Sequence, residues 1–177
     1  MRRFVNILLL VIVILATSGV DSNVAVAASP APGAGGGAEQ ALAIIVNQSN
    51  PVENFSFEDL RKIFLGERSH WPNGRRITLV MLDTSQPERK VVLRDIYAMS
   101  EKDFNNHFIQ GVFTGAVFVS PKTLANPVDV RKFVFNVPGA IAYVRASDVD
   151  SSVKVLRVDG RLPEDKDYRF RISGRSK

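Results

Sequence analysis

Residues 77–97 read ITLVMLDTSQPERKVVLRDIY, and this stretch decides the fold because a strand pattern passes directly into a helix pattern. The run at 77–82 is mostly apolar and has the length and the branched residues of a strand buried on both faces. Ser85 and Glu88 then form the pattern of a capping box, and apolar residues recur at helical spacing as far as Met99. We therefore predict a buried strand, a short loop and a helix.

Strand and helix patterns continue to alternate on both sides of this stretch. ALAIIV at 41–46 reads as another strand buried on both faces, the kind that belongs to a parallel sheet covered by helices. This order implies right-handed crossovers, so we predict an α/β fold of three layers, with a mostly parallel sheet flanked by helices. The other predicted elements are helices at 57–65, from Ser100 to 111–115 and from Asn126 onward, strands at 140–144 and 153–158, and an edge strand around 168–172.

The N-terminus has the features of a secretory signal peptide. Arg2 and Arg3 give it a positive start, and the apolar run at 7–16 is too short for a membrane span, which needs about 20 apolar residues. An Ala-Val-Ala pattern predicts cleavage near Ala27 or Ala28, with an uncleaved interfacial anchor as the alternative. We expect a periplasmic or secreted protein with a signal peptide at 1–28, a flexible Pro/Gly/Ala-rich leader at 29–40 and one domain at 41–177.

Composition narrows the classes of function. The chain has 23 Lys and Arg against 18 Asp and Glu, a formal net charge of +5 at pH 7, and the two signs alternate along the sequence. No basic stripe is present, so we expect no nucleic-acid partner. Cys is absent and the two His are isolated, so we expect no metal and no cofactor. No nucleophile elbow, P-loop or paired Ser and His is present, so we expect no enzyme.

Several segments, taken in order, carry a resemblance to a known family. They are IVNQSNPVENFSFEDLRKIFLG (45–66), WPNG (71–74), the unit at 77–97, VFTG (112–115), VPGAIAYV (137–144) and VKVLRVDG (153–160). Their order resembles the type II periplasmic binding proteins, most closely the substrate-binding proteins of phosphate ABC transporters, in a short form. The resemblance implies that 41–177 is a truncated periplasmic-binding-protein-like domain that binds a solute.

Two parts of the family's pattern are missing from this chain. Members resemble two lobes that close over the anion, and the first half of one lobe has no counterpart here. The family's Arg near the end of a strand corresponds to Met81, and its Ser-Gly-Thr at a helix start corresponds to Ser85, Gln86 and Pro87. Only the Ser is retained.

The candidate ligand-binding residues follow two of the predicted strands. Oxyanion sites combine free N–H groups at a helix start with hydroxyls and an Arg fork, and the carboxyl ends of parallel strands gather such ligands. The alternative roles are a helix cap for the first group and turn formation for the second. The candidates are Asp83, Thr84, Ser85 and Arg89 after the strand at 77–82, and Asn47, Gln48 and Ser49 after the strand at 41–46.

Two functions follow from this sequence. The first is an exported protein that binds phosphate or a related oxyanion for transport or sensing, with a membrane permease as its partner. The second is an interaction module of the cell envelope that keeps the scaffold but has an eroded pocket and works with an envelope protein partner. Phe118, in an apolar stretch flanked by Gly and Pro, is the residue expected in an exposed patch.

Overall fold

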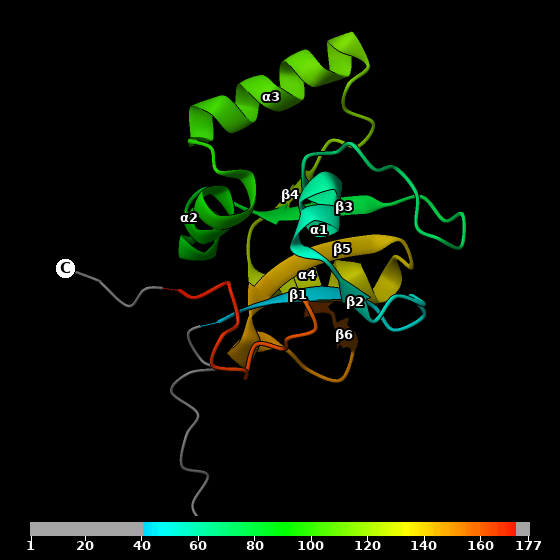
Figure 1. The fold of residues 1–177 in the computed structure, drawn as a ribbon, viewed down its shortest axis with the longest axis vertical. Helices are drawn as coiled ribbons and strands as arrows, with labels where there is room; N and C mark the ends of the chain where they lie inside the picture. Colours follow the sequence, from blue (N-terminus) through cyan, green and yellow to red (C-terminus); the bar gives the residue numbers. More distant parts are fainter. Residues whose placement is uncertain (1–40, 173–177) are drawn as a thin grey trace, which may run out of the picture. The chain divides into compact units, whose positions relative to one another are not determined.

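The computed structural model describes residues 41–172, so the predicted signal peptide at 1–28 and leader at 29–40 lie outside the described residues, as does the end of the chain from 173. A five-stranded sheet forms the centre, in the order β4-β3-β5-β1-β6 (Figure 1). Its strands are β1 (Leu42–Asn47), β3 (Thr78–Leu82), β4 (Lys122–Leu124), β5 (Ala140–Arg145) and β6 (Val153–Val155).

Four of the five strands point in the same direction. β3 is parallel to β4 and to β5, whereas β1 is antiparallel to both β5 and β6. The prediction of a mostly parallel sheet is confirmed, but the expectation that the run at 41–46 is a parallel strand is wrong. All six residues of β1 are buried because layers cover both faces of the sheet, whatever the direction of the strand. The carboxyl end of β1 therefore lies at the opposite edge of the sheet from the carboxyl end of β3.

The two faces of the sheet carry different side chains. Cross-strand partners share a face, so Ile44 of β1 lies beside Tyr143 of β5. This face packs on α1 (Phe57–Phe64), where the Phe64 ring lies 6.4 Å from that of Tyr143. The other face includes Ala43 and Ala142 and packs on α4 (Pro127–Asn136), which lies behind the sheet in Figure 1. Helices thus cover both faces, which confirms the layered α/β fold.

Three of the predicted helix starts are confirmed. Ser56, Ser100 and Asn126 are the N-caps of α1, α3 (Glu101–Thr114) and α4, and each side chain accepts the backbone N–H of the Asp three residues on. Each bond satisfies one of the N–H groups that a helix start leaves free, which stabilises a helix by about 1 kcal/mol.

The predicted capping box of Ser85 and Glu88 is wrong. The helix α2 (Pro87–Val92) begins after Gln86, which makes no side-chain cap bond. Glu88 is instead buried and pairs with Arg145 of β5. The chain continues from α2 into one π-helical turn, η1 (Leu93–Tyr97). This helical segment ends at Ala98, which has the left-handed conformation with φ of 54°.

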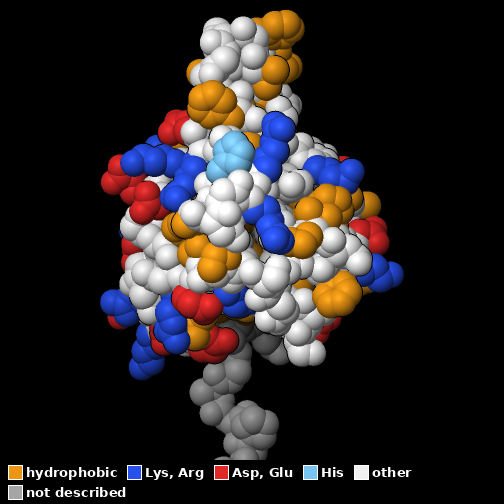
Figure 2. Space-filling model, turned by 90° about the vertical axis from the view of Figure 1, so that its right-hand side faces the viewer, with side chains coloured by type: hydrophobic (Ala, Val, Ile, Leu, Met, Phe, Trp, Pro, Cys, Tyr) orange, Lys and Arg blue, Asp and Glu red, His pale blue; other side chains and the backbone are white. Residues whose placement is uncertain are grey.

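Aromatic packing joins the helix α3 to the domain. The ring of Tyr97 lies 4.9 Å from that of Phe104 and 6.3 Å from that of Phe108. The outer end of the helix leaves apolar side chains exposed, and Figure 2 shows hydrophobic side chains in this uppermost part of the molecule. Phe118 is 57% exposed, as expected. The exposed apolar side chains here are Ile109, Val112, Phe113 and Phe118.

Smaller elements complete the domain. The strand predicted at 153–158 divides between β6 and β7 (Arg157–Val158), and β7 pairs in parallel with the short β2 (Asn54–Phe55). The predicted edge strand around 168–172 is reduced to one bridge between Ala41 and Arg171. A short 3-10 turn, η2 (Ala146–Asp148), follows β5. Among the described residues, no helix has the length and apolar character needed to cross a membrane.

Candidate functional site

A groove of about 550 Å³ lies between α2, η1 and the start of α3, near the carboxyl end of β3. Its position depends on the π-helical turn, which ends at Ala98 and redirects the chain into α3. The residues that line it are Thr84, Arg89, Lys90, Leu93, Arg94, Ala98, Met99, Ser100 and Glu101.

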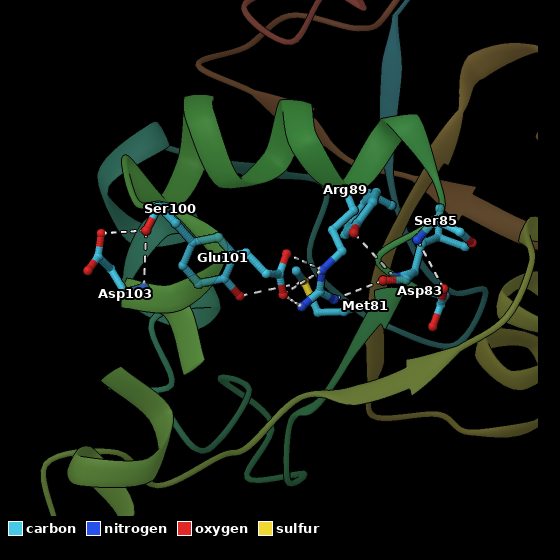
Figure 3. A network of polar contacts seen from close by, with 10 residues as sticks. Met81, Asp83, Ser85, Arg89, Ser100, Glu101 and Asp103 are labelled. Carbon is cyan, nitrogen blue, oxygen red and sulfur yellow. Dashed lines mark hydrogen bonds and ion pairs between the residues drawn. The ribbon is translucent and has the colours of Figure 1, made fainter. Parts of the chain in front are cut away.

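Arg89 is the buried cation of this groove. Its side chain is 4% exposed, its Nη1 donates to the Leu82 carbonyl at 2.8 Å, and its guanidinium carbon lies 4.9 Å from the centre of the Phe104 ring. The Nε and Nη2 groups donate to the Glu101 carboxylate at 3.0 and 2.6 Å (Figure 3). Burial alone lowers the pKa of Arg89, but the hydrogen bond and the charge of Glu101 raise it above its ordinary value. Arg89 is therefore a fixed positive charge.

The charges that line the groove are mainly positive. Lys90 and Arg94 join Arg89, and Glu101 is the one carboxylate among the lining residues. Lys90 and Arg94 are exposed, and Arg94 also pairs with Asp95 at 2.5 Å. With Asp95 counted, three cations are balanced by two carboxylates, and the remaining positive charge of Lys90 favours an anion.

Of the first predicted group, Thr84 and Arg89 line the groove, whereas Asp83 and Ser85 form the turn beside it. The Asp83 carboxylate accepts the Ser85 N–H at 3.0 Å (Figure 3). Hydrogen bonds from the Ser85 backbone and side chain hold the pKa of Asp83 below its usual value. The helix start offers few donors, because Pro87 has no N–H and the Arg89 N–H donates to the Gln86 carbonyl. Side chains, not the helix start, must supply the donors.

The second predicted group lies at the opposite edge of the sheet. Asn47 is buried, and its Nδ2 donates to the carbonyls of Val134 and Phe135 at the end of α4. Its Oδ1 accepts both the N–H and the hydroxyl of Ser49. Gln48 donates to two carbonyls near β6. The structure does not bring this group together with Arg89, because β1 and β3 point in opposite directions.

Met81, which the resemblance places at the position of the family's Arg, belongs to the core. It is fully buried, and its sulfur accepts a hydrogen bond from the Tyr97 hydroxyl at 3.6 Å. The guanidinium of Arg89 nevertheless reaches this end of β3, since its Nη1 bonds the carbonyl of the next residue, Leu82.

Sequence reasoning missed Lys90, Arg94, Ser100 and Glu101 as lining residues. Lys90 and Arg94 are four residues apart on one continuous helical segment, so their common side was detectable from spacing. No comparable signal existed for Glu101, because its contact with Arg89 depends on the turn at Ala98. Within residues 41–172, no group of three or more His, Asp and Glu side chains is placed to hold a metal ion.

Comparison with known proteins places this geometry in context, although no family model matches the chain. The phosphate-binding protein PstS of Bacillus subtilis (strain 168) is 28% identical over 130 residues, which cover 71% of this chain and 38% of that protein. An ABC-type phosphate transport receptor from Vibrio cholerae superposes with a TM-score of 0.57 at 21% identity, over 70% of this chain and 48% of the receptor. The chain has the fold of phosphate-binding receptors.

Other solved structures agree on this receptor fold. The PstS structure from Borrelia burgdorferi superposes with a TM-score of 0.53 at 19% identity. The superposition covers 70% of this chain and 49% of the Borrelia burgdorferi chain. The chain spans 38% of the length of the curated relative and about half of each of these solved structures.

Proposed function

We propose that the chain is an exported solute-binding protein that binds inorganic phosphate or a related oxyanion in the groove between α2 and α3. The observation that carries this proposal is the buried guanidinium of Arg89 in a positively charged groove, within a fold shared with phosphate-binding receptors. The Vibrio cholerae relative is described as a transport receptor. We infer the same use here, in transport or sensing, with a membrane permease as partner.

The groove has the chemistry that a tetrahedral oxyanion requires. A guanidinium offers two parallel N–H donors to two oxygens, and the ammonium of Lys90 and the guanidinium of Arg94 add charge from the same side. The Thr84 hydroxyl supplies a neutral donor. Asp83 and Glu88, the carboxylates on either side of the turn before α2, do not line the groove. The site therefore favours an anion, despite the Met at position 81.

Binding, and not catalysis, is the proposed role, with the periplasm or the exterior of the cell as its place. The relatives are described as binding proteins and receptors, which supports a protein that is not an enzyme. The comparisons do not favour the alternative of an interaction module with an eroded pocket.

Removal of the two exposed cations is expected to weaken phosphate binding by about tenfold or more, a loss of at least about 1.4 kcal/mol. The test is the melting temperature of Lys90→Ala/Arg94→Ala and of the unchanged protein, each with and without millimolar inorganic phosphate. A ligand at 100 times its Kd stabilises the folded state by about 2.7 kcal/mol, so the unchanged protein should show a clear upward shift. For a tenfold weaker variant the same phosphate concentration gives only about 1.4 kcal/mol, so its shift should be about half as large or smaller.

The matched control is Lys132→Ala/Lys166→Ala, which removes two exposed positive charges outside the groove. It should keep the full phosphate-induced shift. If both double variants lost the phosphate-induced shift equally, the stabilisation by phosphate would depend only on the net charge of the protein. The proposed site would then be wrong.

A further inference from the structure

Glu101 occupies the edge of Arg89 that a ligand needs. Both carboxylate oxygens of Glu101 accept from the Nε group of Arg89, at 3.2 and 3.0 Å, and one of them also accepts from Nη2 at 2.6 Å. This is the side-by-side geometry in which a guanidinium also binds two oxygens of a phosphate. The Glu101 carboxylate thus takes the two donors of Arg89, Nε and Nη2, that an anion would use (Figure 3).

The two partners of this ion pair differ in how firmly they are held. Arg89 is 4% exposed, and its bond to the Leu82 carbonyl and its stacking on Phe104 do not depend on Glu101. The Glu101 side chain is 39% exposed and belongs to the first residue of α3. Rotation of Glu101 into solvent would therefore leave the guanidinium in place, with its Nε and Nη2 groups facing the groove.

We propose that the carboxylate of Glu101 is an internal competitor for the oxyanion, and that its displacement sets the affinity of the groove. This inference rests on the proposed function, since it concerns the same site. When a site is open for only a fraction of the time, the apparent Kd is the intrinsic Kd divided by that fraction. Glu101 also adds a negative charge beside the ligand, so it weakens binding even after it has turned away.

The test is isothermal titration calorimetry of the exported protein with inorganic phosphate. Glu101→Gln removes the charge and keeps the shape of the side chain. We expect its Kd for phosphate to be about tenfold lower than that of the unchanged protein. This value corresponds to a site that Glu101 occupies for about nine-tenths of the time in the unchanged protein. The control is Asp103→Asn, which removes the same charge two residues away on α3, outside the groove. Its Kd should stay within about twofold of the unchanged value.

A second variant tests the same inference in case Glu101→Gln does not fold. Glu101→Asp keeps the charge and the acidic first turn of α3 but shortens the side chain by one methylene, so its carboxylate loses the close contact with Arg89. It should also bind phosphate more tightly than the unchanged protein. Circular dichroism before each titration confirms that the variant is folded.

The outcomes separate this inference from the proposed function. Tighter binding in both Glu101 variants supports the competitor. If the unchanged protein binds phosphate and neither Glu101 variant binds it more tightly, the competitor is wrong and the proposed function stands. If neither the unchanged protein nor any variant binds phosphate, both are wrong.

Discussion

Phe64→Ala should lower the free energy of unfolding by about 3–5 kcal/mol, the usual cost of removing a buried aromatic side chain. Phe64 has no exposed surface, and its ring lies 6.0 Å from that of Tyr97 and 6.4 Å from that of Tyr143. It thus joins α1 to the π-helical turn and to β5. The measurement is urea unfolding followed by circular dichroism, with the slope compared between the two proteins.

Phe113→Ala is the matched control for this prediction. Phe113 is 88% exposed on α3, so the same substitution should change stability by no more than about 0.5 kcal/mol. A comparable loss at both positions would show that Phe113 is covered in solution, and a small loss at Phe64 would contradict the core as described.

Gly66→Ala should lower stability by about 2–5 kcal/mol, for two separate reasons. Gly66 has φ of +78°, where an Ala costs about 1–2 kcal/mol. A Cβ at this position would also lie 2.6 Å from the carbonyl oxygen of Val119 and 2.7 Å from a methyl carbon of Val117. Over-packing of this kind adds about 1–3 kcal/mol, because a backbone oxygen cannot move aside cheaply.

Gly74→Ala separates the two reasons. Gly74 has nearly the same φ, +77°, but a Cβ there meets no atom within 4 Å. Thermal unfolding of the two variants should therefore show a loss of only about 1–2 kcal/mol for Gly74→Ala. Equal losses would mean that the close approach of the 117–119 segment to Gly66 is absent in solution.

The aromatic core and the groove are parts of one arrangement. Tyr97 packs on Phe64 and on Phe104, and Phe104 in turn lies under the guanidinium of Arg89. The Nε of Arg61 in α1 donates to the carbonyl of Ile96 in the π-helical turn at 3.0 Å. The positions of Arg89 and Glu101 therefore depend on side chains that do not line the groove.

Local features of the fold were predictable from the sequence. Ser56, Ser100 and Asn126 start helices because each cap is a contact between residues three apart. The same local reasoning failed at Ser85, where the Asp83 side chain takes the Ser85 N–H and the helix begins later. A cap pattern therefore predicts a helix start only when no competing turn is present.

The candidate site was only half predictable. Thr84 was identified because it follows a strand directly, and Arg89 because it is the cation available to offset the nearby carboxylates. Asn47 was assigned to the same site on the assumption that β1 is parallel. Apolar content reports burial and not direction, so the sequence carried no signal for the antiparallel pairing of β1 with β5. The partner of Arg89 also depends on a π-helical turn, which no periodicity at 85–99 indicates.

Titration of the isotope-labelled protein with inorganic phosphate, followed in proton–nitrogen correlation spectra, tests the central claim most directly. We expect saturable shifts of the amide signals of Thr84, Arg89, Lys90 and Ser100, with those of Gln48 and Ser49 unchanged. The absence of any saturable shift, or shifts confined to the loop at 47–49, would contradict an oxyanion site in the groove between α2 and α3.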